Sequence, residues 1–479
     1  MKQHMLGRRS PGDGGSFGVV VLVLFVVIAA AISVYMMQFS SDDMNPFAAA
    51  ADVPSMNSVA EQYVRLVLAM GQHDADYVDA YYGPPEWRKE VEAEKPSLME
   101  IERRAAVLAN DIERLAPSRD SGDDKGRRQG VPGDDNELIG LRHLYLSRQL
   151  DALRARIRIL SGTKFTFDEE SRALYDAVAP THKPDEFQGA LAELDAKLPG
   201  RGPLLQRYEA FRSRFVIPGD KLDATFKAAI EGCRERTVEH IDLPAGESFT
   251  VEYVTNKSWS GYNWYQGNYR SLIQVNTDLP IYVDRAIDLA CHEGYPGHHV
   301  YNALLEKHLV RDRGWVEFSV YPLFSPQSLI AEGTANYGIE VAFPRNERID
   351  FERRVIFPTA GLDPATAQSY YDVLSIVERL SYAGNEAARR YIDGGIDAKG
   401  AADWLESYAL YSRPRAEQRV RFIDQYRSYV INYNLGKDMV ARAIEAQGGN
   451  AENPEKRWEL FEQLLSSPRL PSSLATPKM

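Results

Sequence analysis

The sequence predicts a mainly α-helical protein with a small antiparallel β-sheet or hairpin placed before one motif-bearing helix. Three observations lead to this prediction. Apolar residues recur at helical spacing over most of the chain from residue 58 onward. Alternating, β-branched residues appear in two short stretches, 248–254 and 271–276. A histidine-rich run at 291–299 follows them.

The composition is that of a globular protein with a substantial core. The chain has 479 residues, 44% of them hydrophobic, which argues against global disorder. Its formal net charge of -12 argues against a nucleic-acid partner, which would need a basic face. The two cysteines, Cys233 and Cys291, do not make a disulfide framework. One bridge between them is an alternative, but we favour a free, buried thiol at Cys291 because it adjoins the histidine-rich run.

The N-terminal segment has the pattern of an uncleaved signal anchor. Residues 1–16 form a polar, basic tail, and residues 17–37 then run without a charge over about the length of a membrane span. Positive charge before the span predicts a cytoplasmic tail and an extracytoplasmic (periplasmic) remainder at the inner membrane. A cleaved signal peptide is the alternative, with a site in the alanines at 29–31, but the apolar run continues beyond them. Residues 38–57 are interpreted as a linker.

Residues 58–479 are expected to form one helical domain. The stretch 118–137 is rich in Gly, Asp and Arg without an apolar period, and predicts a mobile loop between helices. The clearest helical patterns lie at 138–160, 187–198, 202–215, 220–242, 401–410 and 416–429.

The two β-branched stretches are interpreted as an antiparallel sheet, with the aromatic, turn-rich residues 259–267 between them. An extended edge strand beside the histidine-rich run would be able to pair with the backbone of a peptide substrate. The alternative is that the aromatic residues form a core cluster under a hairpin.

The histidine-rich run indicates a metal site. It holds three of the nine histidines of the chain, His292, His298 and His299, and Glu293 follows the first of them. Imidazoles combined with a more distant carboxylate suit a zinc ion with an open coordination position. A carboxylate beside the first histidine is placed to take the proton of a metal-bound water. The required distant carboxylate is available in a second compact run, 331–340.

The spacing leaves the second histidine ligand open. In the HExxH motif the second histidine follows the first by four residues, and here Pro296 stands at that position. If 284–305 were one straight helix, His292 and His299 would share a face, nearly two turns apart. Proline followed by glycine predicts instead a kink or a π-type bulge, which could bring His298 round.

The two runs resemble a known family. HEGYPGHH at 292–299 and EGTANYGIE at 332–340 are similar to the DUF885 family of bacterial proteins, whose runs read roughly HE-x-x-PGHH and EGWA-x-Y-x-E. A looser likeness lies at 429–436, so the resemblance covers roughly the C-terminal half, and 58–245 follows by continuity only. The family is regarded as zinc-dependent, largely helical and peptidase-like.

The resemblance implies a ligand set and roles. His298 matches the more regular histidine of the pair, so His292, His298 and Glu332 are expected to bind one zinc ion. Glu293 is expected to act as general base on a zinc-activated water. The chain departs from the family at Thr334, where the family has Trp, and this bears on the shape of the pocket.

Several residues have open roles in this scheme. Oxyanion donors are sought among Tyr433, Tyr429, Arg421 and His299, and His299 is also a candidate for substrate binding. Glu340 would either orient a ligand histidine or be a surface charge. The charged runs 311–313 and 413–415 are interpreted as solvated faces, with binding of a substrate carboxylate by one of the two as the alternative.

Taken together, the expectation is a membrane-anchored, zincin-like helical metallohydrolase that cleaves peptide bonds. One rival is a metallohydrolase of another amide or ester, for instance in cell-wall material. Another is a metal-dependent binding protein without turnover, and a third leaves the histidines as a metal-free core network. The substrate, the choice of endo or exo cleavage and the oligomeric state are not predicted.

Overall fold

The structure is a computed structural model that describes residues 55–116 and 135–474. The predicted tail 1–16 and membrane anchor 17–37 lie outside these ranges, as does nearly all of the predicted linker. In the part of the chain that is described, no helix is long and apolar enough to cross a membrane.

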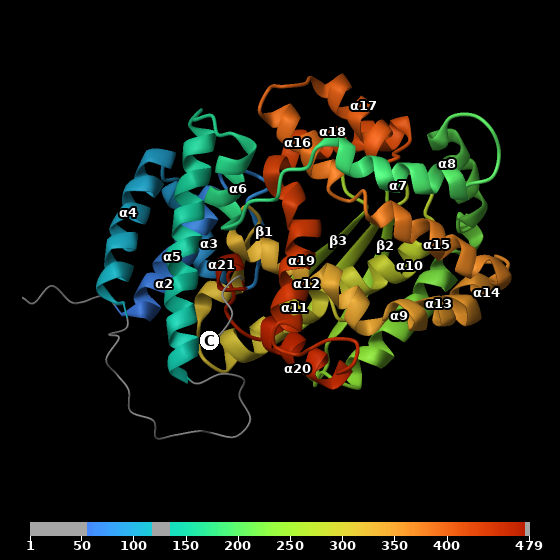
Figure 1. The fold of residues 1–479 in the computed structure, drawn as a ribbon. Helices are drawn as coiled ribbons and strands as arrows, with labels where there is room; N and C mark the ends of the chain where they lie inside the picture. The colour runs from blue at the N-terminus through green and yellow to red at the C-terminus, as the bar shows by residue number, and fades with distance from the viewer. Residues whose placement is uncertain (1–54, 117–134, 475–479) are drawn as a thin grey trace, which may run out of the picture. The chain divides into compact units, whose positions relative to one another are not determined.

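The described chain is mainly helical, as predicted, with two small sheets among the helices (Figure 1). Helix α5 begins at Asp135, so the end of the predicted loop 118–137 is helical and its remainder lies outside the described residues. Helices α4 and α5 lie side by side in Figure 1, and α2 packs against both. The helices before the larger sheet are α2 (Met56–Met70), α3 (Pro85–Glu94), α4 (Leu98–Arg114), α5 (Asp135–Leu160), α6 (Phe167–Tyr175), α7 (Pro184–Lys197), α8 (Leu204–Arg212) and α9 (Leu222–Val238).

Helix α2 illustrates why these segments are helical. The hydroxyl of Ser55 accepts a hydrogen bond from the backbone N–H of Ser58 at 3.1 Å, which satisfies one of the free donors of the first turn. Val59, Tyr63 and Val67 recur at helical spacing and are fully buried. The apolar periodicity thus marks the face that packs into the core.

The larger sheet corrects the predicted antiparallel arrangement. It has three strands in the order β2-β4-β3: β2 (Ser248–Val254), β3 (Gly261–Gly267) and β4 (Arg270–Asn276). Strands β2 and β4 pair in parallel, whereas β3 pairs with β4 in antiparallel orientation. The aromatic stretch between the predicted strands is itself the edge strand β3, because its alternation puts Asn263 and Tyr265 inward and Trp264 outward. A second sheet, not predicted, pairs β1 (Val78–Tyr81) with β5 (Val320–Pro322).

The motif-bearing segment is not one straight helix. Helix α10 (Asp284–Leu289) continues as a π-helical turn, Ala290–Gly294, and after a break the chain enters α11 (His298–Leu305). The predicted kink with π-type distortion is therefore confirmed. The break requires glycine at Gly297, since a Cβ there would lie 1.9 Å from the carbonyl oxygen of His292.

Helix α12 (Pro326–Ala342), which carries the second motif, packs closely on α19 (Ile431–Glu445). A Cβ on Gly333 would lie 2.6 Å from the backbone of Gly436, so these glycines let the two helices approach. The remaining helices are α13 (Arg345–Phe351), α14 (Phe357–Thr359), α15 (Ala367–Glu378), α16 (Ala383–Ile392), α17 (Ala398–Tyr408), α18 (Arg413–Tyr426), α20 (Pro454–Leu465) and α21 (Pro471–Leu474). Short π and 3₁₀ turns lie between several of them.

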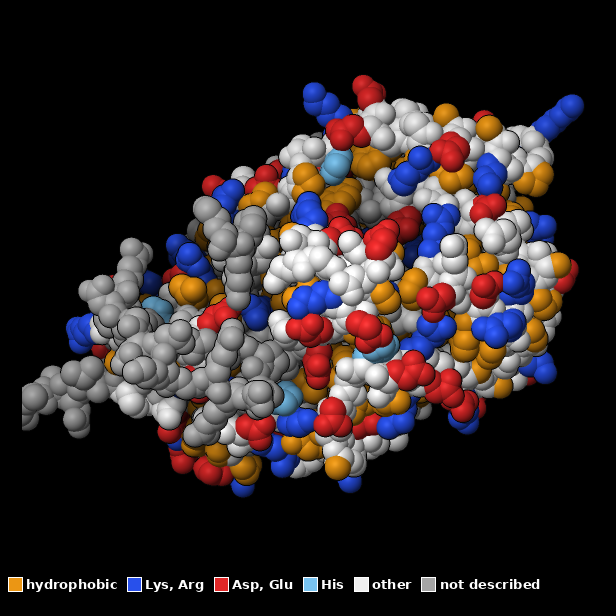
Figure 2. Space-filling model, turned by 60° about the horizontal axis from the view of Figure 1, so that its bottom comes forward, with side chains coloured by type: hydrophobic (Ala, Val, Ile, Leu, Met, Phe, Trp, Pro, Cys, Tyr) orange, Lys and Arg blue, Asp and Glu red, His pale blue; other side chains and the backbone are white. Residues whose placement is uncertain are grey.

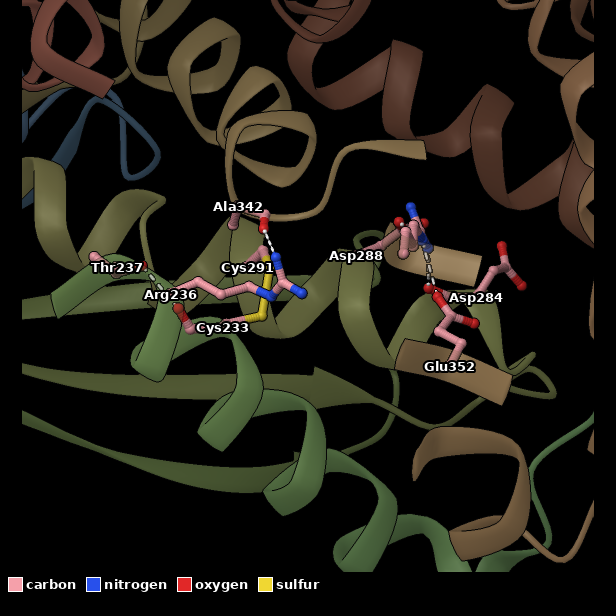
Figure 3. Close-up of a disulfide and its surroundings, with 9 residues drawn as sticks. Cys233, Arg236, Thr237, Asp284, Asp288, Cys291, Ala342 and Glu352 are labelled. Atoms are coloured by element: carbon pink, nitrogen blue, oxygen red, sulfur yellow. Dashed lines mark hydrogen bonds and ion pairs between the residues drawn. A yellow bond between two sulfur atoms is a disulfide. The ribbon is translucent and has the colours of Figure 1, made fainter. Parts of the chain in front are cut away.

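Cys233 and Cys291 form a disulfide, so the preferred prediction of a free thiol at Cys291 is wrong. Helix α9 runs beside the π-helical turn and brings the two Cα atoms to 5.7 Å, within the range that a disulfide spans (Figure 3). One turn along α9, Arg236 donates to the carbonyl oxygen of Ala342 at 3.0 Å. Helix α9 is thus tied both to the segment that carries His292 and to the end of α12.

Breaking this disulfide is expected to lower the free energy of unfolding by about 2–4 kcal/mol, because the bridge closes a long loop and restricts the unfolded chain. The measurement is denaturant unfolding of the oxidised protein with and without reductant. The Cys233→Ala/Cys291→Ala double variant serves as the control, since reductant should not change its stability. Equal stability of the oxidised and reduced wild type would contradict the prediction.

Candidate metal centre

Three residues that the sequence analysis selected as metal ligands converge in the structure. His292 lies on the π-helical turn, His298 begins α11, and Glu332 lies in the middle of α12. The Nε2 atoms of the two histidines are 3.2 Å apart. Glu332 Oε2 lies 3.2 Å from His292 Nε2 and 3.7 Å from His298 Nε2.

The break in the helix explains why His298, and not His299, joins the group. On a straight helix His299 would lie near the face of His292, but the break starts a new helix and redirects the pair. His299 is fully buried and points away, with its Nδ1 2.9 Å from the Ser271 hydroxyl and its Nε2 3.0 Å from Glu247 Oε2. His299 is therefore not placed for catalysis or substrate binding, which corrects those expectations.

The geometry of the three side chains fits a metal ion. Zinc bonds of ordinary length at a tetrahedral centre hold the ligand atoms about 3.3 Å from one another. The three observed separations, 3.2, 3.2 and 3.7 Å, lie close to that value. Although the His292 nitrogen is so near, Glu332 Oε2 is buried and has no properly oriented hydrogen bond to any described residue. Such an arrangement suits ligand atoms that face a common centre.

The electrostatics also suit a cation. Burial lowers the pKa of His298, but the carboxylates of Glu332, Glu293 and Asp79 outweigh that effect and raise its pKa to about 9. Burial raises the pKa of Glu332, but the adjacent imidazoles of His292 and His298 hold it well below the usual range. With neutral imidazoles the cluster carries excess negative charge, which a divalent ion would compensate.

Tyr429 fixes the orientation of the carboxylate ligand. Its hydroxyl donates to Glu332 Oε1 at 2.8 Å, which leaves the other oxygen to face the histidines. A hydroxyl already committed in this way is not free to stabilise an oxyanion. Tyr429 is thus a positioning residue, not the oxyanion donor that the sequence analysis considered.

Glu293 lies beside the triad in the same cavity. Asn263 of β3 donates to the Glu293 backbone carbonyl at 2.7 Å and anchors this turn. A Cβ on Gly261 would lie 2.6 Å from Glu293 Oε1, so glycine in the edge strand leaves room for the carboxylate. Burial raises the pKa of Glu293, although His292 and His298 act in the opposite direction. A carboxylate with a raised pKa is better matched to accepting and returning a proton near neutral pH.

The cavity is large and open to solvent, with a volume of about 1070 Å³. The face drawn in Figure 2 is hollowed, with acidic and basic side chains near the rim. Tyr433 lines the cavity, and burial raises its pKa well above the usual value, so its hydroxyl stays protonated and can donate. Arg421 is exposed and does not line the cavity. Glu340 pairs with Lys437 at 2.5 Å and touches neither ligand histidine.

Sequence reasoning missed two carboxylates, one in the cavity and one that binds the neighbouring His299. Asp79 on β1 lines the cavity and accepts a hydrogen bond from Tyr262, and burial raises its pKa to about 6. Glu247 precedes β2 and binds His299; its burial raises its pKa, but contacts with His299, Tyr295 and Arg234 lower it to about 2. Both residues lie in unremarkable local sequence, so no motif could have revealed them.

Comparisons with known proteins add little to this site. No family model and no curated protein matches the chain. Among solved structures, the chain is similar to "the putative lipoprotein from Colwellia psychrerythraea", with 14% identity, a TM-score of 0.45, and coverage of 79% of this chain and 68% of that one. The chain is also similar to "a putative lipoprotein of unknown function from Shewanella oneidensis". That match has 12% identity and a TM-score of 0.39, and it covers 86% of this chain and 88% of that one. At these scores the interpretation of the site rests on its own residues.

Proposed function

We propose that this chain is a zinc-dependent hydrolase that binds one zinc ion and cleaves amide bonds in peptides. The observation that carries the proposal is the convergence of His292, His298 and Glu332, whose ligand atoms all lie within 4.8 Å of one another. Glu293 lies in the same cavity, beside these three residues. Two histidines, one carboxylate and an adjacent free carboxylate are the set that zinc hydrolases use.

Each residue of this set has a role that its position supports. Bound zinc supplies Lewis-acid chemistry, polarising a carbonyl and making water easier to deprotonate. His292, His298 and Glu332 would hold the ion, with Tyr429 orienting Glu332. Glu293 takes a proton from the attacking water and returns it to the leaving amine. Tyr433, with its protonated hydroxyl on the cavity wall, is the candidate donor to the developing oxyanion.

Peptides are the favoured substrate class because of the strand beside Glu293. β3 is an edge strand, and its first residues line the cavity where Gly261 adjoins the Glu293 carboxylate. An extended peptide adds to such an edge through backbone hydrogen bonds. A cavity of about 1070 Å³ has room for a short peptide, whereas a folded protein would not enter it.

Membership of the DUF885 family and an extracytoplasmic location belong to the same proposal. The two motif runs support the family. The disulfide Cys233–Cys291 supports the location, because such bonds persist in oxidising compartments and are rare in the cytosol. The apolar run 17–37 would then be the inner-membrane anchor.

The test is hydrolysis by the purified full-length chain in detergent, assayed on a peptide library and on cell-wall fragments. We expect cleavage of peptides that a chelator abolishes and added zinc restores. Cleavage of wall fragments alone would replace peptides by another amide as the substrate. Zinc binding without any turnover would favour a metal-dependent binding protein.

A further inference from the structure

Two arginines on α18 face the same cavity as the candidate metal centre. Arg415 and Arg419 are one helical turn apart, and both line the cavity together with His292 and Glu293. Both side chains are partly buried. Aromatic side chains lie beside both arginines. Arg415 lies 4.6 Å from the centre of the Tyr411 ring and is hydrogen-bonded to that side chain, and Arg419 lies 4.7 Å from the centre of the Phe422 ring.

Neither arginine forms an ion pair with a carboxylate of the described residues, unlike their neighbour Arg413. That residue, at the start of the same helix and outside the cavity wall, pairs with Asp403 at 2.6 Å, with Glu406 at 2.9 Å and with Glu417 at 3.0 Å. The Nε of Arg419 is buried without a hydrogen-bond partner in the described chain. A buried donor without a partner and two like charges one turn apart are both unfavourable, and an anion between them would relieve both.

The positive potential of the pair is evident at Tyr411. Burial raises the pKa of its phenol, but Arg415, Arg419 and Arg285 outweigh burial, so the pKa is lowered. Arg285 is already paired with Asp288 at 3.1 Å, whereas the other two remain available. The positive potential of this part of the cavity wall therefore favours binding of a negatively charged group.

A short run of aromatic side chains connects the arginine pair to the candidate metal ligand Glu332. Arg419 lies 5.6 Å from the centre of the Tyr433 ring. The rings of Tyr433 and Tyr429 are 5.9 Å apart, and the Tyr429 hydroxyl binds Glu332. A short peptide with a carboxylate near its scissile bond would reach both ends of this run.

We propose that Arg415 and Arg419 form a subsite for a carboxylate of the substrate. The inference rests on the proposed function for the identity of the ligand as a peptide, but the subsite itself does not depend on turnover. Guanidinium groups bind carboxylates through paired N–H donors in a fixed geometry, which suits this recognition. The carboxylate comes either from the peptide C-terminus or from an acidic side chain, and these two sources are distinguishable.

The test is calorimetric binding of three probes to the chelator-treated full-length chain, in which hydrolysis does not occur. The probes are acetyl-trialanine with a free C-terminus, its C-terminal amide, and the amide of acetyl-Ala-Glu-Ala. We expect the free acid to bind at least about tenfold tighter than its amide, since a charge-assisted bond is lost. Tight binding of the glutamate amide would assign the subsite to acidic side chains; weak binding would assign it to the C-terminus.

Arg415→Gln and Arg419→Gln should each remove this preference, and Arg413→Gln, the matched control on the same helix, should keep it. Arg419→Lys should retain part of the preference for the free acid, because lysine keeps the positive charge but lacks the paired N–H donors of the guanidinium group. Equal binding of all three probes to the wild type would overturn the proposal whatever the variants do, as would a preference that survives both glutamine substitutions. Acid preference without any hydrolysis by the zinc-loaded chain would leave the subsite standing and remove the proposed enzyme.

Discussion

Replacement of Glu293 by glutamine is expected to lower peptide turnover by about 10²–10⁴-fold, the range that a positioned general base contributes. Glutamine keeps the shape of the side chain and the anchoring bond from Asn263 to the Glu293 backbone. It removes only the ability to accept the proton of water. The zinc content should stay near that of the wild type, because Glu293 is not one of the three converging residues. Steady-state hydrolysis and elemental analysis of the same preparation measure both quantities.

A matched control for this substitution is Glu340→Gln. Glu340 lines the same cavity, but its carboxylate pairs with Lys437 and touches none of the candidate ligands. We expect nearly full activity in that variant. If Glu293→Gln were as active as the wild type while still binding zinc, the assignment of the base would be wrong and another cavity carboxylate, such as Asp79, would have to be considered.

The helices were predictable because their signal is local. Apolar spacing along α2 and α5 reflects which face is buried, and each helix carries that information within itself. Strand partners are not local. The alternation in β2 and β4 predicts two strands, but nothing in either one states that they run parallel with β3 at the edge. Short strands such as β1, with four residues, offer too little pattern to be found.

The same distinction between local and distant residues applies to the candidate site. His292, His298 and Glu332 lie in two compact runs, and the proline–glycine break is itself written in the sequence. Two further carboxylates come from distant segments: Asp79 from β1, in the same cavity, and Glu247 from the turn before β2, as the partner of His299. The disulfide was misjudged for the same reason, since only the packing of α9 beside the π-helical turn brings Cys233 to Cys291.

The comparison of His298→Ala with His299→Ala tests the shape of the metal centre most sharply. Removing His298 takes away one of three ligands. Loss of a residue that only hydrogen-bonds to a ligand lowers metal affinity by up to about 10²-fold, so loss of the ligand itself should lower zinc affinity by more than that. His299→Ala should keep zinc, because that ring faces Ser271 and Glu247. The His299→Ala variant should instead lose about 1–3 kcal/mol of stability, because the buried Glu247 carboxylate loses one of its three partners and the Ser271 hydroxyl loses the His299 ring. Elemental analysis and denaturant unfolding give the two readouts.

These neighbouring histidines make the experiment its own control, because a general loss of folding would affect zinc content and stability together in both variants. Zinc lost in His299→Ala but kept in His298→Ala would mean that the chain runs as a straight helix through the motif, against the observed break at Gly297. Zinc absent from the wild type even after it is supplied would leave the cluster as a hydrogen-bonded core network. That outcome would also leave unexplained why Glu332 Oε2, 3.2 Å from a histidine nitrogen, makes no oriented hydrogen bond. The convergence of the three ligand atoms, with Glu332 Oε2 buried and without an oriented partner, is the reason to expect the metal.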